Sequence, residues 1–377
     1  MKKSILLCFS IASLGLLGML YAQQKGPVMP APLPCGMHGD AEVICGTRSP
    51  EDMEVTPDGK FLIVPQFVTG PGGPGVSSGA AGLYLFDPEK KNFTKLVATN
   101  EPLKDWGDAS CPVPIGDQLA PHGMSLAKRS GGPWQLYVVN HGGRQSIEMF
   151  ELKQNGASWS IVWHGCVPST IDYNDVAALA DGGFVATYPT GIQALEAAQA
   201  KGKDKGKQQK GKQASPFSGA PSGFLVRWLP GKGQSELPGT RSGYPNGVVA
   251  TPDGKTAYFA VYGSKEARRY DLRALKTTGT VKLDFMPDNL TWTKKGNLLA
   301  AGIKGLTGEC PVGSGQFCRQ AFEVGYIKAG KMSAKTAYDS DKKGNLITGV
   351  SVAFQHGNDM YIGAFEGDRI VKIAWKE

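Results

Sequence analysis

Short apolar runs separated by turn residues make up most of this 377-residue chain. The runs are rich in Val, Ile, Phe and Tyr and are bounded by Gly, Pro, Asp or Asn, which is typical of β-strands. Apolar residues at helical spacing are scarce. The pattern therefore predicts an all-β protein, and chains of this length often form a single all-β domain.

A turn-and-strand unit recurs along the chain. The sequence Thr-Pro-Asp-Gly-Lys occupies residues 56–60 and again residues 251–255, and an apolar run follows each copy. Weaker copies begin at Asp181, Lys295 and Gly357. Pro fixes φ and Gly accepts positive φ, so the unit suits a tight hairpin turn. Repeats of roughly 40–60 residues, each a small antiparallel sheet, predict a β-propeller, and six blades fit the length best. A β-sandwich would not need so many similar hairpins.

The first residues are typical of a secretory signal. Lys2 and Lys3 precede a mostly apolar run, and Ala22 offers a small residue for cleavage. A membrane anchor is the alternative, but the run is short for a span and is broken by Ser and Gly. We therefore expect a periplasmic or secreted protein without a stable membrane span. The predicted division is a signal peptide over residues 1–22, an amino-terminal extension over 23–44 and a propeller over 45–377.

Most of the positive charge lies in one low-complexity segment. Residues 197–222 are rich in Lys, Gln, Gly, Ser and Pro, which predicts a disordered insert in a blade connection. Six lysines and one aspartate there contribute +5 of the net charge of +8, and Lys2 and Lys3 contribute +2. The remaining body is nearly neutral, so no nucleic-acid partner is expected. The insert is either a solvated spacer or a contact for anionic envelope surfaces.

Six cysteines remain after the predicted signal peptide. An even number in an exported chain indicates disulfides, although the sequence alone allows 15 connectivities. Local pairing favours Cys35–Cys45 and Cys310–Cys318, which leaves Cys111 and Cys166. The absence of a Cys-x-x-Cys pair and the presence of only five histidines argue against a zinc cage and against thiol redox chemistry.

Five short polar clusters stand where strands are expected to begin. In a propeller, the innermost strands line a central channel, so equivalent positions at their starts converge on one rim. Calcium needs six to eight oxygen ligands, which no single cluster supplies but the five together do. Taken singly, Asn246-Gly247 is more typical of a turn, Asp288-Asn289 of a strand cap and Glu51-Asp52 of a solvated loop. The clusters are Glu51-Asp52, His122-Gly123-Met124, Asn174-Asp175, Asn246-Gly247 and Asp288-Asn289.

The order, spacing and flanks of these clusters resemble those of the paraoxonase/arylesterase family. That family lies within the larger senescence-marker-protein/gluconolactonase-like and strictosidine-synthase-like group of calcium-dependent β-propellers. The resemblance covers most of residues 45–375. It rests on Glu-Asp-hydrophobic-Glu from Glu51, Pro-His-Gly at His122, Val-Val-Asn-His ending at His141, and the Asn-Asp, Asn-Gly and Asp-Asn pairs.

The resemblance implies two calcium ions in the central tunnel. An irregular set of oxygens with two carboxylates at each site suits calcium better than magnesium. The exposed, catalytic ion would be held by Glu51, Asn174, Asn246, Asp288 and Asn289. The deeper, structural ion would be held by Asp52, Asp175 and the backbone carbonyl of Met124.

The resemblance also implies that His122 and His141 form a catalytic dyad. A near-neutral imidazole, or alternatively the carboxylate of Glu51, would act as general base on water. The alternative is that His122 only packs near the structural ion. His38, His164 and His356 belong to no motif, and no Gly-x-Ser-x-Gly sequence supports a serine hydrolase.

The sequence departs from the family in two places. Tyr188-Pro189-Thr190 stands where the family carries an Asn-Asp-His-type stretch, so the wall that selects substrates differs. No cysteine follows Cys318 to tie the chain ends together, so we expect an amino-terminal strand to pair with the final blade.

The leading hypothesis is a monomeric calcium-dependent hydrolase of small-molecule lactones or aryl esters. The alternatives are a non-catalytic calcium-stabilised propeller that binds a periplasmic ligand or protein, and a sugar lactonase of the gluconolactonase type.

Overall fold

The computed structural model describes residues 33–67, 69–70, 73–74, 81–192, 217–305 and 320–377. The predicted signal peptide, the Cys310–Cys318 pair and most of the Lys-rich insert lie outside the described residues. Within these ranges, no helix is long and apolar enough to cross a membrane.

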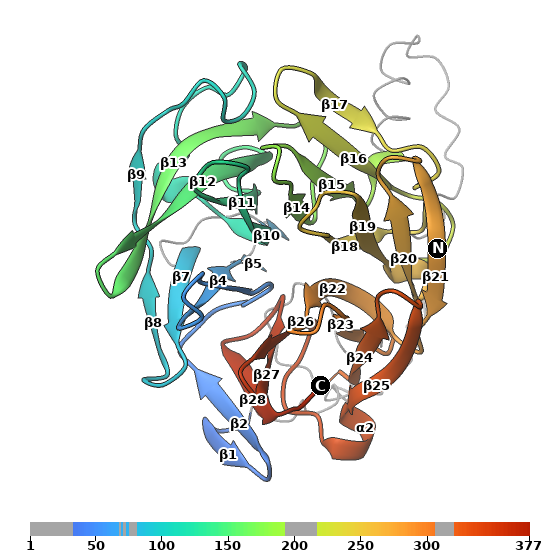
Figure 1. The fold of residues 1–377 in the computed structure, drawn as a ribbon. Coiled ribbons are helices and arrows are strands. Elements are labelled where there is room, and N and C mark those ends of the chain that lie inside the picture. The colour runs from blue at the N-terminus through green and yellow to red at the C-terminus, as the bar shows by residue number, and fades with distance from the viewer. Residues whose placement is uncertain (1–32, 68, 71–72, 75–80, 193–216, 306–319) are drawn as a thin grey trace, which may run out of the picture.

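Six small antiparallel sheets surround a central axis, which confirms the six-bladed β-propeller (Figure 1). From the innermost strand outward, blade one contains β3 (Glu54–Val55), β4 (Leu62–Gln66), β7 (Gly82–Asp87) and β8 (Asn92–Lys95). Blade two contains β10 (Pro121–Lys128), β11 (Trp134–Asn140), β12 (Ser146–Asn155) and β13 (Ser158–Pro168). Blade three contains β14 (Val176–Ala178), β15 (Phe184–Tyr188), β16 (Phe224–Leu229) and β17 (Gly233–Glu236). Blade four contains β18 (Pro245–Ala250), β19 (Thr256–Val261), β20 (Glu266–Asp271) and β21 (Lys276–Lys282). Blade five contains β22 (Met286–Trp292), β23 (Leu298–Ile303), β24 (Phe322–Lys328) and β25 (Ser333–Asp339). Blade six contains β26 (Val350–His356), β27 (Asp359–Ala364), β28 (Arg369–Ala374) and β2 (Ala41–Cys45).

The remaining elements are short. They are β1 (Gly36–His38), which pairs with β2; β9 (Ala98–Asn100), which runs parallel to β13; the two-stranded pair β5 (Thr69–Gly70) and β6 (Gly73–Pro74); the 3₁₀ turns η1 (Gly116–Gln118) and η2 (Tyr262–Ser264); and α2 (Ser340–Lys343).

The repeated Thr-Pro-Asp-Gly-Lys sequence forms the same turn in blades one and four. The Thr56 hydroxyl donates to the Asp58 carboxylate at 2.7 Å, and Thr251 donates to Asp253 at 2.6 Å. Gly59 and Gly254 have φ of +71° and +64°, the region that side-chain-bearing residues avoid. Each turn joins the innermost strand of its blade to the next strand, as the sequence pattern predicts.

The ring closes by pairing the amino-terminal β2 with β28 of blade six, as expected from the sequence. The register runs from Ala41 opposite Ile373 to Cys45 opposite Arg369. The Cys35–Cys45 disulfide joins the β1 end of this hairpin to β2.

Apolar residues fill the spaces between neighbouring blades rather than the axis. One buried cluster lies at each of the six blade interfaces. Between blades six and one, for example, Ile44 and Ile370 pack with Met53 and Leu62. Burial of this surface is the main favourable term in folding, and it holds the starts of the innermost strands at fixed positions around the axis.

The end of the predicted Lys-rich insert lies in the described part and is packed. The ring of Phe217 lies 4.9 Å from that of Tyr244 and 5.5 Å from that of Tyr262. Ser222 is buried, and its hydroxyl donates to the carbonyl of Pro189 at 2.8 Å. Residues 217–222 therefore belong to the body of blades three and four.

We predict that Ile44→Ala lowers the free energy of unfolding by about 2–5 kcal/mol, since it opens a cavity at the closing interface. Met37→Ala, on the same hairpin but 65% exposed, should change it by about 0.5 kcal/mol or less. Denaturant unfolding of both variants checks this. Equal losses would show that β2 does not close the ring by burying Ile44.

Candidate metal centre and histidine pair

β-Bulges at the starts of the innermost strands point the predicted site residues into the channel. The strand register shifts between Pro121 and Met124 in β10, between Pro245 and Val248 in β18, and between Pro287 and Leu290 in β22. A bulge leaves residues unpaired and re-aims their side chains. The residues released in this way are His122 and Gly123, Asn246 and Gly247, and Asp288 and Asn289. A fourth bulge, in β26, releases Ser351.

Two glycines allow the next innermost strand to approach the bulge closely. A Cβ atom on Gly123 would lie 2.7 Å from the Cα of Asp175, and one on Gly247 would lie 2.5 Å from the Cα of Asn289. Both distances are below any ordinary contact. The glycines of the Pro-His-Gly and Asn-Gly motifs are therefore needed so that site residues of adjacent blades can meet.

Four buried side-chain oxygens at the axis have no hydrogen-bond partner among the described residues. They are Glu51 Oε2, Asn174 Oδ1, Asn246 Oδ1 and Asn289 Oδ1, on side chains that are between 1% and 7% exposed. Buried polar atoms are almost always paired, so a group of unpaired oxygens needs an explanation. A hard cation, which takes oxygen ligands from carboxylates and amides, provides one.

Hydrogen bonds to the amide nitrogens fix the direction of two of these oxygens. The Asn289 amide donates to the backbone carbonyl of Glu51 at 2.9 Å and to Glu51 Oε1 at 2.7 Å. The Asn246 side chain forms a hydrogen bond to Asp288. In both side chains the amide nitrogen is thus used in a hydrogen bond, and the Oδ1 atom is left free to bind a ligand.

The carboxylates at the axis repel one another. Burial, and then the charges of Glu51 and Asp175, raise the pKa of Asp288 well above its usual range. Burial and neighbouring carboxylates also raise the pKa of Asp52 and of Asp175. In the part of the chain that the structure describes, no Lys or Arg forms an ion pair with these four carboxylates. Either protons or a cation must offset their charge.

The asparagine oxygens are needed for these residues to form a metal site. Within the described ranges, no three or more His, Cys, Asp or Glu side chains group as metal ligands by themselves. Glu51 and Asp288 supply two carboxylates, and Asn174, Asn246 and Asn289 supply amide oxygens. This neutral-plus-anionic oxygen set fits calcium rather than zinc or another metal that prefers nitrogen or sulfur.

The deeper pair of aspartates joins neighbouring blades. Asp52 accepts hydrogen bonds from the backbone N–H of Met53 at 2.7 Å and of Met124 at 2.8 Å. Asp175 accepts from Val176 at 2.7 Å and from Val248 at 2.6 Å. Each carboxylate thus links two innermost strands and keeps further lone pairs. That Asp52, Asp175 and the Met124 carbonyl hold a structural ion stays a prediction.

The two histidines form a hydrogen-bonded pair that reaches Glu51. His122 Nδ1 lies 2.9 Å from His141 Nε2, and His122 Nε2 lies 3.5 Å from Glu51 Oε1. His141 Nδ1 lies 2.6 Å from Gln145 Oε1. Phe67 stacks on His122 with ring centroids 4.5 Å apart and nearly parallel planes. Side chains from blades one and two therefore hold both imidazoles.

His141 stays uncharged at neutral pH. Burial, and then repulsion from His122, lower the pKa of His141 to about 3. A neutral His141 that donates from Nδ1 to Gln145 must accept at Nε2 the proton carried by His122 Nδ1. In the neutral form of His122 the lone pair would then lie at Nε2, the nitrogen 3.5 Å from Glu51 Oε1, and a general base requires such a lone pair.

Three contributors were missed in the sequence. Gln145 follows His141 by four residues, and Phe67 follows β4; neither position belongs to a recognisable motif. Ser351, whose hydroxyl donates to the backbone carbonyl of Glu51 at 2.8 Å, stands at the start of blade six. Extending the blade-start pattern to residue 351 would have found it.

The other three histidines form contacts outside the histidine pair, and Tyr188 lines a groove between two blades. His164 is buried against Glu151, whereas His38 and His356 contact the backbone carbonyls of Pro34 and Gly59. Tyr188 stacks on Tyr173 and lines an open groove of about 600 Å³ between blades two and three.

No protein-family model matches this chain, and no curated protein matches it. Solved structures similar to it include a luciferin-regenerating enzyme, 14% identical over 89% of this chain and 94% of that one, with a TM-score of 0.49. A putative gluconolactonase is 14% identical over 90% and 93%, with a TM-score of 0.47. A catalytically inactive virginiamycin B lyase from Staphylococcus aureus is 11% identical over 89% and 99%, with a TM-score of 0.45. At these values the similarities carry no argument about chemistry.

We predict that calcium stabilises the fold through the oxygens at the axis. At 100 times its Kd, an ion that binds only the folded state adds about 2.7 kcal/mol to the free energy of unfolding. Asn246→Ala should abolish most of this gain, whereas Asn92→Ala, on the exposed β8, should keep it. Thermal unfolding with calcium or with chelator measures the gain. An equal gain in both variants would contradict the assignment of Asn246.

Proposed function

We propose that this propeller is a calcium-dependent hydrolase of lactones or aryl esters, similar to the paraoxonase/arylesterase family. One observation carries the proposal: Glu51 belongs both to the group of unpaired buried oxygens and to the chain of contacts through His122 and His141. A cation site and a candidate base thus meet at one side chain, which is the arrangement that ester hydrolysis needs.

The residues present fit a calcium ion at the upper position. Glu51, Asn174, Asn246, Asp288 and Asn289 would hold it. Bound there, calcium would supply a Lewis acid that polarises a carbonyl oxygen. Asp52, Asp175 and the carbonyl of Met124 would hold the second, structural ion, and the links between blades made by the two aspartates favour a role in rigidity.

The protein side chains would manage the proton. Neutral His122 would take a proton from water at Nε2, the nitrogen that lies on the side of Glu51. The hydrogen bond to neutral His141 holds the ring in this tautomer. Phe67 covers one face of His122 and limits its rotation. Glu51 is the alternative base, because its Oε1 lies 3.5 Å from the same imidazole nitrogen.

Export fits this function. The Cys35–Cys45 and Cys111–Cys166 disulfides are compatible with a periplasmic or secreted protein. We propose that residues 1–22 are a cleaved signal peptide and that the protein acts as a monomer on small molecules outside the cytoplasm.

Hydrolysis should depend on calcium. We expect turnover of aliphatic lactones and phenyl esters to be lost in excess chelator and restored by added calcium. Asn246→Ala should lower kcat/KM at least 100-fold, whereas Asn92→Ala should match the wild type. Spectrophotometric assays measure both. Full activity in chelator, or in Asn246→Ala, would exclude the mechanism.

Replacing His122 should remove the base without removing the ion. We expect His122→Gln to lower kcat by about 10²–10⁴-fold while its calcium-dependent stabilisation persists. His38→Gln, on the outer β1, is the matched control and should keep full activity. If His122→Gln stays active, the base is Glu51 or another group, and the histidine only packs.

The substrate panel separates the remaining hypotheses. Preference for sugar lactones over acyl lactones and aryl esters would indicate a gluconolactonase-type enzyme. Binding without turnover across the panel would favour the non-catalytic propeller, for which the altered segment at Tyr188-Pro189-Thr190 is the supporting feature.

A further inference from the structure

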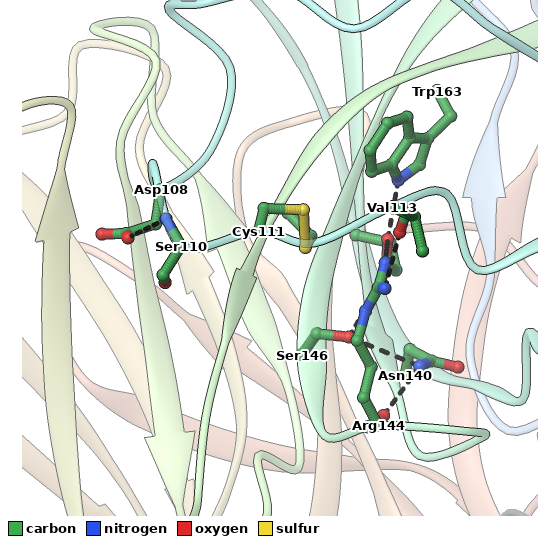
Figure 2. The surroundings of a disulfide bond; sticks show 10 residues. Asp108, Ser110, Cys111, Val113, Asn140, Arg144, Ser146 and Trp163 are labelled. Atoms are coloured by element: carbon green, nitrogen blue, oxygen red, sulfur yellow. Dashed lines mark hydrogen bonds and ion pairs between the residues drawn. A yellow bond between two sulfur atoms is a disulfide. The ribbon is translucent and has the colours of Figure 1, made fainter.

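A long segment between β9 and β10 lies across blade two and leads directly to His122. We name residues 101–120 the strap. Its middle is joined to the blade by the Cys111–Cys166 disulfide, in which Cys166 of β13 is fully buried (Figure 2). Within the described residues, the strap therefore connects β10 to β13 by a covalent bond as well as along the chain.

The first half of the strap lies along β13. The N–H groups of Glu101 and Leu103 donate to the carbonyls of Trp163 and His164 at 2.9 and 3.0 Å. The N–H of Asp108 donates to the carbonyl of Cys166 at 2.8 Å. The disulfide at Cys111 thus follows a series of backbone hydrogen bonds between the strap and β13.

The second half of the strap lies on the turn between β11 and β12, residues 141–145. The N–H of His141 donates to the carbonyl of Ala120 at 3.1 Å. Arg144 donates to the carbonyl of Val113 at 2.6 Å (Figure 2). A Cβ on Gly142 would overlap the carbonyl of Gln118. Strap and turn are therefore in direct backbone contact with no room between them.

This turn carries the outer end of the histidine chain. His141 begins it and Gln145 ends it, and their side chains are hydrogen-bonded to each other. Asn140 donates to the carbonyls of Gly142 and Arg144, both at 2.8 Å, which fixes the loop between them.

A buried ion pair anchors the turn from below. Both oxygens of the fully buried Glu148 accept from Arg144, at 2.8 and 2.9 Å. Ser146 and Trp163 also donate to Glu148, at 2.6 and 2.7 Å. With the carboxylate satisfied in this way, Arg144 holds a single orientation and presents its remaining N–H groups to the strap.

We propose that the strap is a positioning element for the histidine pair, and that the Cys111–Cys166 disulfide is the anchor that sets its position. The effect passes from Cys111 through the contacts of Val113 and Gln118 to the turn, then through Gln145 to His141 and His122. Neither cysteine touches the reacting groups. Opening the disulfide frees the strap and loosens the pair, while the oxygens at the axis, held by other strands, keep their places.

The proposal rests on the proposed function only for its activity readout. The main measurement is therefore on the imidazoles: NMR of ¹⁵N-histidine-labelled protein reports the hydrogen-bonded ring protons of His122 and His141. Hydrogen exchange of the strap amides and calcium-dependent stabilisation are measured on the same samples.

Two disulfide variants form the comparison. In Cys111→Ser/Cys166→Ser we expect loss or broadening of the paired imidazole signals and faster strap exchange. The kcat should fall about 10–100-fold, with KM changed less than threefold and the calcium effect intact. Cys35→Ser/Cys45→Ser removes the other described disulfide, in the outer hairpin, and should leave the imidazole signals and kcat unchanged.

Chemical reduction provides a second route to the same state. A dithiol transfers two electrons and two protons to the bond, giving the Cys111 and Cys166 thiols, and leaves as its own disulfide. Applied to a protein in which Cys35, Cys45, Cys310 and Cys318 are all replaced by Ser, it should reproduce the imidazole signals of the Cys111→Ser/Cys166→Ser variant.

Several outcomes would overturn the proposal. Unchanged imidazole signals despite faster strap exchange would show that the strap does not position the pair. If the serine variant is unfolded, the Cys111→Ala/Cys166→Val variant replaces it, because it keeps the apolar packing. If the imidazole signals are then lost only when the whole protein unfolds, the disulfide has a purely structural role. A wild type without hydrolytic activity would refute the proposed function, while the imidazole signals would still decide the role of the strap.

Discussion

The constraint on which the rest of this structure depends is electrostatic: the starts of four of the six innermost strands direct carboxylates and amide oxygens at one axis, away from water. Glu51, Asp52, Asp175 and Asp288 are all buried there. Such a group of acceptors has no stable arrangement without protons or a cation. The apolar clusters between blades hold the strands in place against this repulsion. The repulsion between these groups therefore lowers the free energy of unfolding, and a bound cation would raise it again.

The fold followed from local patterns because propeller blades are made of local hairpins. The Thr-Pro-Asp-Gly-Lys turns and the short apolar runs identified the strands, and the length gave the number of blades. The gathering of the five polar clusters followed from their shared position at blade starts. Closure by an amino-terminal strand followed from the lack of a late cysteine.

The remaining features depend on contacts that a linear pattern does not contain. The bulges that release His122 and Asn246 are shifts in register, visible only when two strands are paired. Gln145 acts through the geometry of one turn, and Phe67 reaches His122 from another blade. The packing of Phe217 against Tyr244 and Tyr262 likewise overrides a composition that, by itself, indicates disorder at residues 217–222.

The pairing of β2 with β28 also fixes the order of events during synthesis. The strand at residues 41–45 is made early, but its partner at residues 369–373 is among the last to be made. Until then β2 has no β28 to pair with, and both open edges of the ring can pair with other chains. A pairing of such wide sequence separation forms slowly. A chain still bound to the ribosome is thus an open arc, and early termination would yield an aggregation-prone product rather than a smaller propeller.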